Sequence, residues 1–104
     1  MKPEELAKKI KKALDTLNRR SEIGKVWCSF SEDRKKKAAR EIAERALEEF
    51  TKRPRLRNVL ISAWGTTRGH LGSGCKCLRI GRDGEVDFYH AQGDWGCVLG
   101  LEYF

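Results

Sequence analysis

The spacing of the apolar residues changes once along this chain, close to Pro54. Before that point, apolar residues recur every three or four positions, which is the period of an amphipathic helix. After it, short apolar runs are separated by glycine-containing turns, which is the pattern of β-strands. Helices that all precede the strands are typical of an α+β domain with an antiparallel sheet. The pattern therefore argues against a doubly wound parallel fold.

Two helices are expected in the first half. The first covers residues 3–19, and Pro3 stands at a first-turn position where proline is tolerated. Its apolar stripe consists of Leu6, Ile10, Leu14 and Leu17. The second begins at a capping serine, Ser31 or Ser29, and runs to about residue 50. The buried face expected for it comprises Ala39, Ile42, Ala43, Ala46, Leu47 and Phe50.

The segment between these helices, residues 25–30, is short, apolar and prone to β structure. It fits a strand, and it also fits an extended link that pins the two helices together through Trp27 and Phe30. We favour the extended link, and the sequence leaves the strand open as the alternative.

The second half predicts three or four strands. They are expected at residues 58–64, 75–81, 85–91 and 95–104. The sequence Arg82-Asp83-Gly84 is a strong hairpin signal between the second and the third. The expected fold is therefore a single α+β domain, residues 1–104. In it, two N-terminal helices (residues 1–53) pack on one face of a three- to four-stranded antiparallel meander (residues 58–104).

Positive charge is concentrated in the first part of the chain. Residues 1–58 hold 18 Lys and Arg against 10 Asp and Glu, which gives a net charge of +8. Residues 59–104 hold 4 against 5, a net charge of −1, and the two parts together give the formal +7 of the chain. This asymmetry favours a polyanionic partner for the helical side. Lysine and arginine also keep a small protein in solution, so charge alone does not decide between these roles.

Two basic runs differ in their acidic neighbours. Residues 34–37 look like a nucleic-acid patch, but acidic residues at i,i+4 spacing indicate a self-neutralised, solvated face. The pairs expected there are Glu32–Lys36, Asp33–Lys37, Lys37–Glu41 and Arg40–Glu44. Residues 52–57 hold four cations and no acidic residue, and Pro54 ends the helix within them. We therefore expect phosphate contacts at this second run, where the helices meet the sheet.

The leading functional hypothesis is a small basic protein that binds a polyanion, RNA or a nucleoprotein complex above all. The residues expected to hold phosphates are Lys52, Arg53, Arg55, Arg57 and Arg68. Trp64 and Trp95 each stand beside a glycine at a junction of strand and loop, and they are expected to stack unpaired bases. These patterns favour binding over catalysis.

A metal-independent, toxin-like ribonuclease is the first alternative. His70, in the glycine-rich loop of residues 65–74, and His90 would serve as acid and base near neutral pH. Arg68 would hold a phosphate or a developing negative charge. The second alternative is a protein-interaction module or inhibitor, or an engineered scaffold, and it rests on the regular helices. The scarcity of amides suits a thermophilic or a designed protein.

The cysteines give a weak metal signal. Cys75 and Cys77 share one strand face, and with Cys97 and His70 they would supply four ligands for zinc. The chain lacks the paired Cys-x-x-Cys spacing of zinc sites, so the expectation is no cofactor, with zinc as the alternative. No stretch approaches the ~18 uninterrupted apolar residues of a membrane span. The expected location is therefore the cytoplasm, with no membrane partner, and the oligomeric state stays open.

Overall fold

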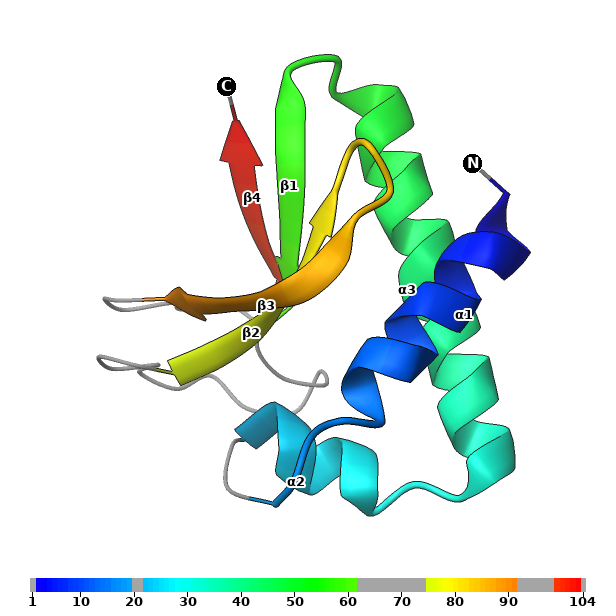
Figure 1. Cartoon of the computed structure of the whole chain (residues 1–104). Coiled ribbons are helices and arrows are strands. Elements are labelled where there is room, and N and C mark those ends of the chain that lie inside the picture. The colour runs from blue at the N-terminus through cyan, green and yellow to red at the C-terminus, as the bar shows by residue number, and fades with distance from the viewer. Residues whose placement is uncertain (1, 20–21, 62–74, 92–98, 104) are drawn as a thin grey trace.

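A computed structural model describes residues 2–19, 22–61, 75–91 and 99–103. Its elements are α1 (Pro3–Leu14), α2 (Glu22–Cys28), α3 (Glu32–Lys52), β1 (Leu56–Ile61), β2 (Cys75–Gly81), β3 (Val86–Ala91) and β4 (Leu99–Tyr103). Helices α1 and α3 pack along each other and lie on one side of an antiparallel sheet (Figure 1). The expected α+β class, with helices first and an antiparallel sheet after them, is confirmed.

The sheet has the strand order β3-β2-β1-β4. The first three strands form the expected meander, whereas β4 pairs with the other edge of β1. A fourth strand that returns to lie beside the first is the order of a Greek key. This places β1 inside the sheet, so that Val59 and Leu60, on its two faces, are both buried. The prediction that this strand is central is confirmed.

Helix α2 replaces the extended link that was expected over residues 25–30, so that expectation was wrong. The helical turn brings the Trp27 side chain into the core, where it is 1% exposed. There its indole Nε1 donates a hydrogen bond to Asp15 Oδ1 at 3.0 Å. Burial of this large side chain outweighs the local β propensity of the segment, because propensity is a weak preference that tertiary packing overrides.

The core lies between the helices and the sheet. It is built from Leu6, Ile10, Leu14, Trp27, Ala38, Ala39, Ile42, Ala43, Ala46, Phe50, Leu56, Val59, Leu78 and Ile80. The buried face predicted for α3 is confirmed, with Leu47 only partly buried and Ala38 added to it. The four alanines carry little bulk, which lets α1 and the sheet approach the backbone of α3 closely. Helix α1 ends at Leu14, five residues before the expected end.

Arg82, in the turn between β2 and β3, ties the end of α3 to the sheet. Its Nε donates to the carbonyl of Leu56 at 2.7 Å, and its Nη2 donates to Arg53 at 2.7 Å and Phe50 at 3.2 Å. The guanidinium also lies 5.1 Å from the centroid of the Phe50 ring. The last carbonyls of a helix lack partners within it and carry partial negative charge, so a cation there is stabilising. Gly84, with φ 89°, supplies the left-handed residue of the same turn.

We expect Arg82→Ala to lower the free energy of unfolding by about 2 kcal/mol, because it removes three charge-assisted hydrogen bonds. Arg82→Lys should recover less than half of the loss, since a single ammonium lacks the fork that reaches all three carbonyls. Urea denaturation followed by circular dichroism measures both. Arg55→Ala, which removes an exposed arginine nearby, is the matched control, and equal losses in the control and in Arg82→Ala would contradict this role.

Asp15 follows α1 and joins it to α2. Partial burial acts to raise the pKa of its carboxyl, but hydrogen bonds from Lys11 and Trp27 outweigh burial and hold the pKa below its ordinary value. Lys11 Nζ lies 2.8 Å from Asp15 Oδ2. A carboxyl whose pKa is lowered on folding stabilises the fold above its unfolded pKa, and this contribution is lost as the pH falls through the folded value.

We therefore expect the free energy of unfolding to fall as the pH drops below about 4, the ordinary pKa of aspartate. The free energy of unfolding of Asp15→Asn should fall less on acidification than that of wild type. The difference should stay below about 1 kcal/mol, because the Asp15 carboxylate is 38% exposed and solvent screens its charge. Denaturation curves between pH 2 and pH 7 measure it. Glu41→Gln, an exposed carboxylate on α3, is the control, and Asp15→Asn matching the control would contradict the assignment.

Candidate functional site

The expected phosphate site at residues 52–57 is partly neutralised in the structure. Lys52 Nζ lies 2.7 Å from Glu48 Oε1, and Arg53 Nε lies 2.8 Å from Glu49 Oε2. The hydrogen bond from Arg53 lowers the pKa of Glu49, and the hydrogen bond to Glu48 raises the pKa of Lys52. Both partners come from the last turns of α3, outside the basic run itself. Arg55 and Arg57 are also exposed at this joint.

Several predicted site residues lie outside the described part of the chain. They are Trp64, Arg68, His70, Trp95 and Cys97. For His90, Cys75 and Cys77 the structure gives the backbone position: His90 pairs with Lys76, between the two cysteine positions of β2. Among the described residues, no group of three or more His, Cys, Asp or Glu is arranged to hold a metal ion. The ribonuclease and zinc hypotheses therefore stay predictions.

On the outer face of the sheet, Arg79 of β2 lies opposite Leu60 of β1 and Asp87 of β3. Arg79 alternates with Leu78 and Ile80, which face the core, so it points the other way. Its guanidinium binds both carboxylate oxygens of Asp87, at 2.7 and 2.6 Å, and donates to Asn58 Oδ1 at 3.4 Å. This arginine is held by neighbouring strands and is not presented to a ligand.

A basic groove runs between α1 and α3, with a volume of about 230 Å³. Its lining residues are Glu4, Ala7, Lys8, Lys11, Lys36, Ala39 and Arg40. Four cations from two helices thus surround one carboxylate. The two alanines leave room between the longer side chains, because they place only a methyl group there.

The cations of this groove fall into two classes. Lys11 and Arg40 are fixed by carboxylates: Lys11 lies 3.1 Å from Glu32, and Arg40 lies 2.7 Å from Glu44. Lys8 and Lys36 are exposed and form no ion pair with a described residue. Two ammonium groups are therefore available to an incoming anion, beside two cations already held in place.

The sequence analysis missed this groove because it interpreted the cations of residues 34–37 as neutralised along their own helix. Of the four pairs expected there, the described structure forms only Arg40–Glu44. Glu32 instead binds Lys11 of α1 and Lys35, which leaves Lys36 without its expected partner. The sequence does contain a signal for such a patch. Two cations three residues apart on one helix and two cations four residues apart on the next form a joint patch if the helix faces that carry them are neighbours.

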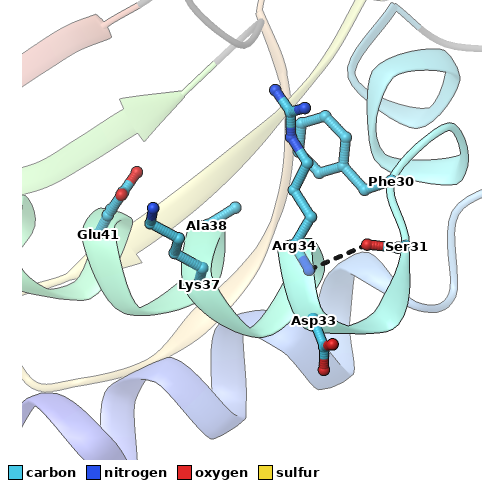
Figure 2. A pocket seen from close by; sticks show the side chains of 7 residues that line it. All are labelled: Phe30, Ser31, Asp33, Arg34, Lys37, Ala38 and Glu41. Atoms are coloured by element: carbon cyan, nitrogen blue, oxygen red, sulfur yellow. Dashed lines mark hydrogen bonds between the residues drawn. The ribbon is translucent and has the colours of Figure 1, made fainter.

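A second hollow, of about 500 Å³, lies on the other flank of α3 (Figure 2). Its described lining residues are Phe30, Ser31, Asp33, Arg34, Lys37, Ala38 and Glu41. The guanidinium carbon of Arg34 lies 4.5 Å from the centroid of the Phe30 ring. In Figure 2 the side chains of Arg34, Lys37 and Glu41 point to one side of the helix, whereas Asp33 points away from them. We call this hollow the Phe30 pocket.

The two hollows share α3 as a common wall. Lys36 lines the groove and Lys37 lines the Phe30 pocket. Consecutive residues of a helix point about 100° apart, so these two lysines stand on either side of the solvent-facing ridge of α3. An extended anion that crosses this ridge can contact both lysines.

Comparison with protein-family models, with the sequences of curated proteins and with solved structures gives no match to this chain. Within the described ranges, no helix combines the length and the apolar character needed to cross a lipid bilayer.

Proposed function

We propose that this protein binds a polyanion, with RNA or an RNA-containing complex as the ligand that fits best. The observation that carries the proposal is the groove between α1 and α3, where Lys8, Lys11, Lys36 and Arg40 converge on one small hollow. Phosphate oxygens are suited to such a site, because their binding neutralises the cations and releases the counterions of the nucleic acid.

The ion pairs of the groove support binding without a rearrangement of the backbone. Glu4, Glu32 and Glu44 hold the side chains of Lys11 and Arg40 in place before a ligand arrives. Their carboxylates also offset part of the positive charge, so most of the attraction comes from the two ammonium groups without such partners. We expect moderate affinity that depends strongly on salt concentration.

Further cations lie at the joint of helix and sheet. Arg55 and Arg57 are exposed there, while Lys52 and Arg53 are engaged by glutamates. We assign Arg55 and Arg57 a secondary role in phosphate binding. The contacts expected from Arg68, Trp64 and Trp95 belong to the same proposal and await their own test.

The test is RNA binding measured by filter retention at rising salt, for wild type and for two double variants. Lys8→Glu/Lys36→Glu should weaken binding about tenfold and reduce the slope of log K against log salt by about 1.4, because two phosphate contacts at about 0.7 each are lost. Arg55→Glu/Arg57→Glu changes the net charge equally and should cause a smaller loss.

The outcomes separate three cases. Undetectable binding of wild type at low salt removes the proposal. Equal losses in the two double variants would show attraction by net charge alone and would remove the groove as the site. A larger loss in Arg55→Glu/Arg57→Glu would move the main contact to the joint of helix and sheet. Circular dichroism of each variant confirms that the fold is retained.

A further inference from the structure

The Phe30 pocket contains groups that the basic groove lacks: an aromatic ring with a guanidinium lying over it. We infer that this pocket receives one unpaired base of a single-stranded RNA, so that the protein prefers single strands to duplexes. The inference rests on the proposed function, because it names the form of RNA that the same basic surface would bind.

The aromatic ring of the Phe30 pocket is supported by a buried neighbouring side chain. The ring of Phe30 packs against Trp27, with 6.2 Å between the ring centroids and 55° between the planes. Trp27 is itself buried and hydrogen-bonded to Asp15. Phe30 therefore has a fixed place at the junction of α2 and α3.

Arg34 lies over the Phe30 ring, with its guanidinium carbon 4.5 Å from the ring centroid. Its backbone N–H donates to Ser31 Oγ at 3.3 Å, which places it in the first turn of α3. The residue is exposed, and its guanidinium forms no ion pair with any described residue. Unpaired bases stack on guanidinium planes as well as on aromatic rings. The side of the Arg34 guanidinium that faces away from Phe30 can thus receive a base.

Lys37 and Glu41 supply the polar contacts on the same side of the helix, as Figure 2 shows. The pair expected between them is not among the ion pairs of the described residues, so the ammonium and the carboxylate are both available. The ammonium suits the phosphate that follows the base. The carboxylate can accept a hydrogen bond from an amino group of cytosine, adenine or guanine, and uracil has no such group.

The size and position of the pocket fit this ligand. About 500 Å³ lies within the range of small-ligand pockets, so the space suffices for one base and its sugar. The neighbouring lysines Lys36 and Lys37 then guide the phosphate chain over the ridge of α3 and into the basic groove. A duplex keeps its bases stacked and paired, and it offers none to the pocket.

The experiment compares binding of a short oligocytidylate with binding of a duplex RNA of the same length, both at low salt. Arg34→Ala should weaken binding of the single strand about tenfold, because one base loses its stacking partner. Arg45→Ala is the matched control: it removes an exposed arginine from the same helix, about 16 Å further along its axis. Both variants should weaken binding of the duplex by the same small factor.

Two further variants test the base contacts themselves. Phe30→Leu keeps apolar packing on Trp27 but removes the ring under Arg34. It should therefore weaken binding of the single strand and leave binding of the duplex unchanged. Glu41→Gln should reduce the preference for oligocytidylate over oligouridylate, because a neutral amide is a weaker acceptor for the cytosine amino group.

Arg34→Ala behaving like Arg45→Ala on the single strand would overturn the inference and leave RNA binding intact. Equal losses on single strand and duplex would make Arg34 a phosphate contact and would also overturn it. If wild type binds neither RNA, the proposed function fails and the inference fails with it.

Discussion

The guanidinium of Arg82 joins the end of α3 to the first residue of β1. It binds carbonyls at the end of α3 and at the start of β1, and it lies over the ring of Phe50. One side chain therefore contacts both the end of the last helix and the start of the central strand. Because β1 pairs with both β2 and β4, this junction joins α3 to the inner part of the sheet.

With α3 fixed in this way, its surface divides into regions of different chemistry. The alanine-rich face is buried, and α1 covers the adjoining flank, where the basic groove lies. The other flank carries the Phe30 pocket. Ion pairs that cross from one helix to the next, such as Lys11–Glu32, bind acidic residues of α3. Without these pairs, the same residues would neutralise cations along α3 itself. The proposed binding surface thus results from how α1 and α3 pack.

The sequence predicted part of the candidate site and missed the rest for a physical reason. It indicated correctly that positive charge gathers in the helical half, since this follows from a count of residues. It placed the surplus at residues 52–57, where neighbouring glutamates bind Lys52 and Arg53. Spacing of i,i+4 shows which pairs are within reach on one helix, but a closer partner on another helix competes for the same carboxylate.

The sequence by itself determined that helices precede strands, and it also determined the buried face of α3 and the hairpin at Arg82-Asp83-Gly84. These depend on the local period of apolar residues and on the backbone freedom of Gly84, which are properties of short segments. Only the tertiary structure decided that residues 22–28 are helical and that β4 pairs with β1. It also decided which cations meet in the groove. Those outcomes depend on contacts between residues far apart in the chain, and the burial of Trp27 beside Asp15 shows that such contacts outweigh local preference.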